Sequence, residues 1–312
     1  MIAGPLTIVA HDAGAANHIF AWLGDEKPVL CLEGPARALW LDRIRKGDPV
    51  TVPETLFFPG QNTEPYIFNE TKLTEAISRS ATVITGTGWE SNLEHDARKL
   101  ARDRGIRSIA VIDHWVNYLD RFVRNGEQVL PDEIWVSDGY AARIARLTFP
   151  TVKVVQQPNS YLEGLVSEVR CCKPLTLVEA TNRVLYLLEP IRHLWGELNK
   201  PGELLALDYF MAERHRARIP LQAEIRLRPH PSDPPGKYQD WLSRHANSRV
   251  KLDPSASLAE SLIWSNIVVG CQTYAMVVAL ACGRIVISSI PPWAPKCILP
   301  QREIRHLADL PL

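Results

Sequence analysis

The 312-residue chain carries 35 Lys and Arg residues against 35 Asp and Glu residues, so its formal net charge is zero. This balance gives no support for nucleic-acid binding, and 46% hydrophobic with 22% charged residues is typical of a globular protein. The length favours two domains. No apolar run approaches the ~20 residues needed to cross a bilayer, and the N-terminus lacks the basic region of a signal peptide. We expect a cytoplasmic protein without an integral membrane segment, with its oligomeric state open between monomer and homodimer.

The six cysteines are scattered and form no CxxC pair. This usage indicates reduced thiols rather than a zinc site or a disulfide framework. We therefore expect no metal and no cofactor.

The first half alternates short apolar runs with helical segments. This alternation predicts a parallel, doubly wound sheet, in which the turns that follow the strands gather at one edge. The expected helices are 13–22, Pro35–Arg45, Thr71–Ser80, Glu90–Arg104 and Tyr140–Leu147. The expected strands are Leu6–Ala10, Pro28–Leu32, Leu56–Phe58, Ala81–Thr85, Ser108–Ile112, Glu133–Ser137 and Val152–Val155.

The turn after the first strand reads His11-Asp-Ala-Gly14 and opens a helix. A glycine at a helix N-terminus offers free N–H groups to an anion or a sugar, although a single glycine is not a dinucleotide fingerprint. Asp12 is a candidate general base, with His11 orienting it or binding ligand. The alternative is that Asp12 only caps the helix.

A second polar turn, Asp113-His-Trp-Val-Asn-Tyr118, follows the strand 108–112. Asp113 and His114 are candidates for an acid–base or substrate-orienting pair. The alternative reading is that the aromatic residues fill an interface and His114 is structural. Asp138, after a later strand, is expected to cap a helix, and it is also a rival to Asp12 as the base.

Residues 161–182 lack a clean period and are expected to link the first domain, 1–160, to a second, 183–312, with a short helix near Leu162–Val169. The second domain repeats the alternation of strands and helices, which predicts a second Rossmann-like sheet. Its expected strands are Arg183–Leu188, Ile225–Arg228, Val250–Leu252, Asn266–Gly270 and Arg284–Ser288, and its expected helices are Leu204–Arg216, Tyr238–His245, one after the cap Ser257, and Ala275–Cys282.

Three turns of this second domain carry polar side chains. The corner Arg228-Pro-His-Pro231 ends a strand, and its two prolines flank His230. The prolines restrict the backbone, so Arg228 and His230 are held in fixed positions that suit a phosphate. Gln272 and Thr273 stand at a strand-to-helix turn, where N–H and hydroxyl groups also suit phosphate. Glu189 and Arg192 follow another strand. The alternatives are a rigid turn with a surface salt bridge for the first corner and a simple helix cap for Thr273.

Residues 183–290 resemble the donor-binding domain of GT-B glycosyltransferases that build bacterial surface polysaccharides: polysialyltransferases, capsule Kdo transferases and CDP-glycerol glycerophosphotransferases. The matching motifs are Arg228-Pro-His-Pro231 and Val269-Gly-Cys-Gln-Thr273, about forty residues on. In those families the His-Pro corner binds the nucleotide phosphate. Gln272 departs from their pattern, which more often has adjacent hydroxyl residues here. Their acidic-Gly base motif could correspond to Asp12-Ala-Gly14, where an alanine intervenes.

The resemblance implies two Rossmann-like domains facing a cleft and a metal-independent transferase. It would move a sugar from a CMP-, CDP- or UDP-linked donor to a hydroxyl acceptor, a glycan or small molecule. His230 and Asp12 would be catalytic, with Asp113 as the other candidate base. The remaining candidates would bind substrate: Arg228, Gln272, Thr273, Glu189, Arg192, His11, Gly14 and His114. The alternatives are a nucleotide-sugar 2-epimerase or hydrolase, and a binding protein without catalysis.

Overall fold

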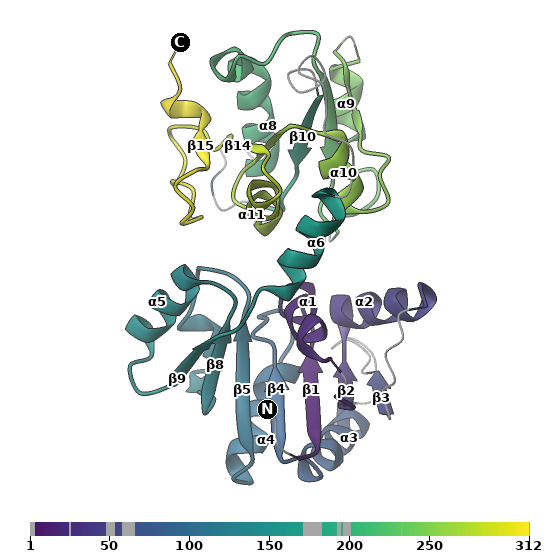
Figure 1. Cartoon of the computed structure of the whole chain (residues 1–312), viewed down its shortest axis with the longest axis vertical. Helices are drawn as coiled ribbons and strands as arrows, with labels where there is room; N and C mark the ends of the chain where they lie inside the picture. The colour runs from purple at the N-terminus through teal and green to yellow at the C-terminus, as the bar shows by residue number, and fades with distance from the viewer. Residues whose placement is uncertain are drawn as a thin grey trace. The chain divides into compact units, whose positions relative to one another are not determined.

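The computed structural model describes residues 4–24, 26–47, 54–57, 66–170, 183–191, 195, 201–231, 233–246 and 248–311. The chain divides into two compact units, Met1–Tyr161 and Leu162–Leu312, and each is built on its own parallel sheet (Figure 1). The predicted linker 161–182 falls partly on 171–182, outside the described residues. No helix in the described parts of the chain is long and apolar enough to span a membrane.

The first unit contains a seven-stranded parallel sheet in the order β3-β2-β1-β4-β5-β8-β9. The inner strands are buried along their length, because a parallel sheet is covered on both faces. The strands are β1 (Leu6–Ala10), β2 (Val29–Leu32), β3 (Glu54–Phe57), β4 (Thr82–Thr85), β5 (Arg107–Ile112), β8 (Glu133–Val136) and β9 (Lys153–Gln156).

Helices cover both faces of this sheet. Alternate β1 side chains point to opposite faces: Ile8 packs in the cluster that contains α1 and α2, whereas Val9 packs in the cluster that contains α3 and α4. The helices are α1 (Ala13–Trp22), α2 (Gly34–Arg45), α3 (Tyr66–Ser78), α4 (Leu93–Asp103) and α5 (Gly139–Thr148). The sheet is therefore doubly wound, as predicted.

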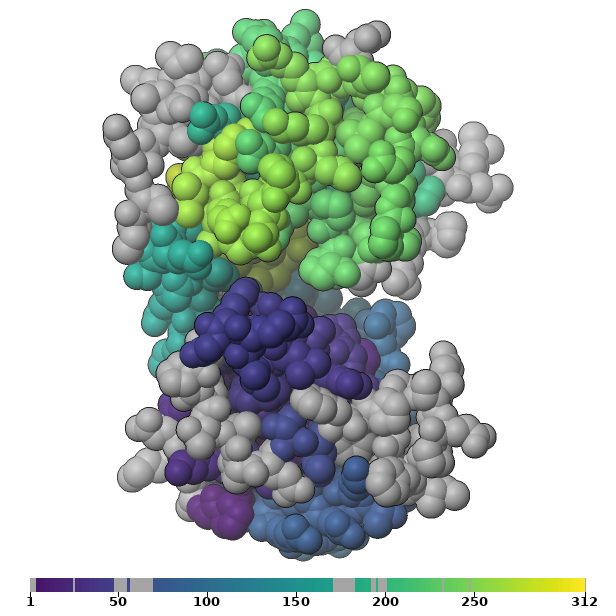
Figure 2. All heavy atoms as spheres, turned by 90° about the vertical axis from the view of Figure 1, so that its right-hand side faces the viewer, coloured from purple at the N-terminus to yellow at the C-terminus, as the bar shows by residue number. Residues whose placement is uncertain are grey.

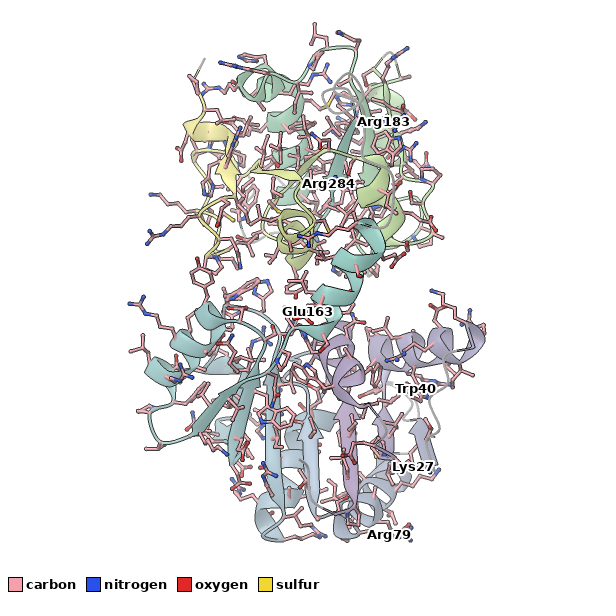
Figure 3. The ribbon with its side chains drawn as sticks, in the orientation of Figure 1. Lys27, Trp40, Arg79, Glu163, Arg183 and Arg284 are labelled. Carbon is pink, nitrogen blue, oxygen red and sulfur yellow. The ribbon has the colours of Figure 1, made fainter. Side chains whose placement is uncertain are left out.

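Trp40 fixes α2 to the first core. Its side chain is 1% exposed, and its ring centroid lies 5.1 Å from that of Phe20 on α1 (Figure 3). The opposite side of α2 faces solvent and forms an outer surface of the first unit (Figure 2).

The second unit contains a six-stranded parallel sheet in the order β12-β11-β10-β13-β14-β15. Its strands are β10 (Arg183–Leu187), β11 (Glu224–Arg228), β12 (Val250–Leu252), β13 (Ile267–Gly270), β14 (Ile285–Ser288) and β15 (Arg305–His306). Its helices are α8 (Gly202–Glu213), α9 (Gln239–Arg244), α10 (Leu258–Trp264) and α11 (Tyr274–Ala281), and α6 (Ser160–Arg170) spans the division between the units.

Two differences from the predicted elements bear on the site. Helix α4 begins at Leu93 rather than at Glu90, because Ser91 turns back and its hydroxyl accepts a hydrogen bond from the Leu93 amide at 3.1 Å. The very short strands β6 (Val123–Arg124), β7 (Glu127–Gln128) and β15 were not predicted, since two residues carry no hydrophobic period. Three-residue or four-residue 3-10 helices complete the chain at Asp120–Phe122, Arg214–Ala217 and Leu307–Asp309.

Each sheet has one point at which the strand order reverses direction. In the first unit it lies between β1 and β4, and in the second between β10 and β13. Ligands of open α/β sheets bind beyond the carboxyl ends of the strands at this switch point. The turns after these four strands are therefore where each unit is expected to hold a ligand.

Candidate functional site

The two turns at the first switch point are joined by Glu94 of α4. Its Oε1 accepts the backbone N–H of His11 at 2.9 Å, and its Oε2 accepts that of Gly88 at 2.5 Å. Burial raises the pKa of Glu94 to about 7, and the charge of Asp12 adds to this effect. The carboxyl group thus replaces the missing backbone partners of both turns.

Arg98, one helical turn after Glu94 on α4, stabilises the end of β4 and the turn that follows it. Its side chain is 1% exposed, and its Nη1 donates to Thr85 Oγ1 at 2.9 Å and to the Gly86 carbonyl at 2.8 Å. Burial lowers the pKa of Arg98 to about 10, although Glu94 opposes the shift. A buried cation next to a buried acid holds the β4 turn in place.

The side chain of Asp12 is more exposed than those of His11 and Asp113. Its side chain is 31% exposed, and its Oδ1 lies 2.6 Å from Nδ1 of His11. Burial alone would lower the pKa of His11, but the hydrogen bond to Asp12 and the surrounding carboxylates raise it. Although Asp12 occupies the N-cap position of α1, its side chain makes no capping hydrogen bond. The arrangement is therefore a His–Asp pair and not a simple cap.

Asp113 lies beside this pair. A Cβ added to Gly14 would lie 1.7 Å from Oδ2 of Asp113, so the carboxyl group packs directly on the first turn of α1. Its Oδ1 accepts from Nη1 of Arg121 at 3.2 Å. Burial alone would raise the pKa of Asp113, but the Arg121 charge and two nearby histidines lower it. Asp113 is thus held as a carboxylate, paired with a cation.

The other candidates in this unit, Asp138, His114 and Gly14, contact residues of the fold itself. Oδ1 of Asp138 accepts the N–H of Ala141 at 2.8 Å, which confirms the predicted helix cap, and its carboxylate also accepts from Trp115. The His114 ring lies 5.2 Å from the Trp115 ring, and burial lowers the pKa of His114. Gly14 acts by giving Asp113 room.

In the second unit, Arg228 ends β11 within a network of hydrogen bonds. Its Nη1 donates to Asp253 Oδ2 at 2.9 Å, to Ser261 Oγ at 2.9 Å and to the Ser255 carbonyl at 3.2 Å. The Asp253 side chain is fully buried, whereas that of Arg228 is 23% exposed. Asp253 therefore orients the guanidinium group and offsets part of its charge.

The His230 backbone is braced by Asp233. The Asp233 Oδ2 accepts the His230 N–H at 3.0 Å and the Tyr238 hydroxyl at 2.8 Å. Its Oδ1 accepts from Lys237 at 2.6 Å, and Lys237 also contacts Glu203 at 2.7 Å. These bonds, together with the flanking prolines, fix the corner and leave the His230 ring half-buried.

Glu189 bridges the second switch point as Glu94 bridges the first. It follows β10, and its Oε2 accepts the backbone N–H of Gln272 at 2.9 Å. Burial raises the pKa of Glu189 to about 7, although this hydrogen bond opposes the shift. The Gln272 Oε1 accepts from the Ile298 N–H at 3.4 Å, and Thr273 is the N-cap of α11 without a capping side-chain bond. The Thr273 hydroxyl is therefore not used as a cap.

The structure places the predicted residues in two groups, one in each unit. His11, Asp12, Gly14 and Asp113 lie together at the first switch point, and Glu189, Gln272 and Thr273 lie at the second. Arg228 and His230 follow β11, on the other side of β10 from β13 in the same sheet. Arg192 lies outside the described residues.

Sequence reasoning missed Glu94, Arg98, Arg121, Asp253 and Asp233. The i, i+4 spacing of Glu94 and Arg98 was visible, but on an amphipathic helix it reads as a solvent-facing pair. Only the fold shows that both side chains are buried.

No protein-family model and no curated protein sequence matches the chain. Solved structures do match it in fold. The UDP-GlcNAc 2-epimerase from Neisseria meningitidis bound to UDP-GlcNAc has a TM-score of 0.63 at 13% identity, over 91% of this chain and 82% of that one. The MnaA–UDP structure from S. aureus has a TM-score of 0.63 at 12% identity, over 92% of this chain and 79% of that one. The UDP-GlcNAc 2-epimerase from Methanocaldococcus jannaschii has a TM-score of 0.56 at 10% identity, over 91% of this chain and 83% of that one.

At these identities the likeness concerns the fold. Together with the two parallel sheets, it confirms the predicted fold class: two Rossmann-like α/β domains of the GT-B type.

Proposed function

We propose that this protein is a metal-independent enzyme of nucleotide-sugar metabolism, and that it transfers the sugar of a nucleotide-linked donor to a hydroxyl acceptor. The observation that carries the proposal is the set of polar turns at the second switch point and at the neighbouring strand β11. There a braced Arg228–His230 corner follows β11, and Gln272 and Thr273 open α11. Cations and helix N–H groups that follow strands of one parallel sheet suit the phosphate of a nucleotide.

The assigned roles follow from the chemistry of the transfer. Asp12 removes the proton from the acceptor hydroxyl, and the resulting oxygen attacks the anomeric carbon of the sugar. The bond from that carbon to the phosphate oxygen breaks, and its electron pair leaves with the nucleotide. His230 and Arg228 neutralise the departing phosphate, which is the main electrostatic demand of the transition state.

Asp12 is preferred to Asp113 as the base. Its carboxylate is the more exposed of the two, and it pairs with His11, whereas Asp113 is already paired with the permanent cation Arg121. A carboxylate held by arginine is a poorer proton acceptor, because the charge lowers its pKa.

A second candidate is 2-epimerisation of a nucleotide sugar, and the fold likeness favours it. Two UDP-GlcNAc 2-epimerases match this chain over 91% of its length. Such a reaction uses the same phosphate site and base but needs no acceptor.

The two reactions are separable by product analysis. The protein is incubated in D2O with EDTA and a panel of CMP-, CDP- and UDP-sugars, with and without oligosaccharide acceptors. Transfer predicts release of nucleotide that depends on the acceptor, with a new glycosidic product. Epimerisation predicts a changed donor and deuterium at C2 without any acceptor, because inverting C2 breaks its C–H bond. A donor left unchanged in every mixture would contradict both.

The catalytic assignment is tested by Asp12→Asn. General-base catalysis contributes about 10²–10⁴-fold, so kcat should fall by at least about a hundredfold while donor affinity is kept. Asp42→Asn is the matched control, since Asp42 is a half-exposed carboxylate on α2 that pairs only with Arg45 and Lys46 in the described chain. Equal kcat values for the two variants would remove Asp12 from the mechanism.

A further inference from the structure

The turn after β4 exposes one large apolar side chain directly after a run of buried residues. Trp89 is 70% exposed, but Thr87, Gly88 and Ser91 are buried. No residue in the described ranges makes a hydrogen bond or ring contact with the Trp89 side chain. An exposed indole offers a large aromatic face to a ligand.

This turn is rigidly held. Oε2 of Glu94 accepts the Gly88 N–H, and the Gly88 carbonyl accepts from Nη2 of Arg124. The Thr87 hydroxyl donates to the Val111 carbonyl at 3.0 Å, and that of Ser91 donates to Glu33. Bonds on both sides of Trp89 therefore fix the backbone that presents it.

The turn also lies against the candidate base. A Cβ added to Gly88 would lie 2.3 Å from Oδ2 of Asp12. Consecutive Cα atoms are 3.8 Å apart, so the Trp89 side chain starts within about 8 Å of the Asp12 carboxylate. A sugar chain of two or three rings can span that distance. A ligand in contact with Trp89 can thus place a hydroxyl group on Asp12.

We infer that Trp89 is the stacking platform for the acceptor, and that the acceptor is a carbohydrate ring. This inference rests on the proposed transfer reaction. A pyranose has a face of C–H groups that packs on an aromatic ring and a rim of hydroxyl groups, one of which meets Asp12. A small polyol such as glycerol offers no such face, so a glycan fits the pair Trp89–Asp12 better.

The kinetic test compares Trp89→Ala and Trp89→Phe with the wild type. Loss of an aromatic stacking contact weakens affinity by up to about tenfold. Trp89→Ala should raise the acceptor KM about tenfold, Trp89→Phe should raise it less, and the donor KM should not change. Leu147→Ala is the matched control, because Leu147 is a 74% exposed apolar residue of the same unit, on α5. An unchanged acceptor KM, or an equal rise in the donor KM, would overturn the inference.

A second readout does not depend on turnover. Saturation-transfer NMR is recorded with chitobiose, maltotriose, lactose and sialyllactose on wild-type protein and on Trp89→Ala. The inference predicts contact for at least one sugar in the wild type and in Leu147→Ala, and its loss in Trp89→Ala. Glycan contact without any transfer would refute the proposed function and leave the binding platform standing. The absence of contact with all four sugars in the wild type would overturn the platform itself.

Discussion

At the scale of single residues, two buried glutamates define the chemistry of the switch points. Glu94 and Glu189 reach them from different elements, one from a helix and one from the end of a strand. Each accepts backbone N–H groups from the turns, and burial raises the pKa of each to about 7. Near neutral pH each of these carboxyl groups is therefore partly protonated and carries less negative charge than an ordinary glutamate.

This raised pKa has a consequence for stability. The folded pKa of Glu189, about 7, lies above the ordinary value of 4.5. The folded state therefore holds the proton more tightly, and stability falls as the pH rises from about 4.5 to 7. Glu189→Gln keeps an acceptor oxygen and removes the titration. Its free energy of unfolding, relative to the wild type, should rise by about 3 kcal/mol between pH 4.5 and pH 8.

Urea unfolding at the two pH values measures the effect. Glu163→Gln serves as the control, since Glu163 is an exposed glutamate on α6 (Figure 3), and its difference from the wild type should not vary with pH. If the difference in unfolding free energy between Glu189→Gln and the wild type is also the same at both pH values, the pKa of Glu189 is not raised as described.

At the scale of elements, the helix N-termini are shaped by what packs on them. Gly14 stands in the first turn of α1, where a better helix former would be favoured in isolation. The Asp113 carboxyl group occupies the space of its missing side chain. The glycine thus serves a close approach between two turns rather than a backbone bend.

Gly14→Ala should therefore destabilise the protein. The added methyl group would displace Asp113 and weaken its pairing with Arg121, and overpacking of this kind costs about 1–3 kcal/mol. Gly164→Ala on α6 is the opposite case, because nothing lies within 4 Å of the added carbon. That change should stabilise by up to about 1 kcal/mol. Thermal unfolding of both variants measures these changes in stability. If the Gly14→Ala protein is as stable as the Gly164→Ala protein, the packing described is wrong.

The sequence predicted the strands better than the sites. The runs Leu6–Ala10 and Val250–Leu252 match the observed strands β1 and β12. The first is fully buried, as inner parallel strands are, whereas the second is a more exposed strand at the edge of its sheet. The polar turns were also found. What could not be read was which side chains complete them, since Glu94 and Asp253 come from elements distant in sequence, by 83 residues from His11 in the first case. Pairing at that separation is a property of the fold.

At the scale of the molecule, the same scheme occurs twice. Each unit has a doubly wound sheet, one switch point and one buried glutamate that ties the two turns there. The exposed polar groups differ: a His–Asp pair beside an indole in the first unit, and an Arg–His corner beside a helix N-terminus in the second. On this difference we base the proposal that the first unit holds the acceptor and the second unit holds the phosphate.

The most direct test of this account is calorimetric titration of CMP, CDP, UDP and GDP into the wild type, His230→Ala and His215→Ala. His215 is an exposed histidine of the same unit and serves as the control. A charge-assisted hydrogen bond to phosphate corresponds to about tenfold or more in affinity. The account predicts that at least one nucleotide binds the wild type and His215→Ala equally, and binds His230→Ala at least about tenfold more weakly. Equal binding by all three proteins, or no binding to the wild type, would contradict it.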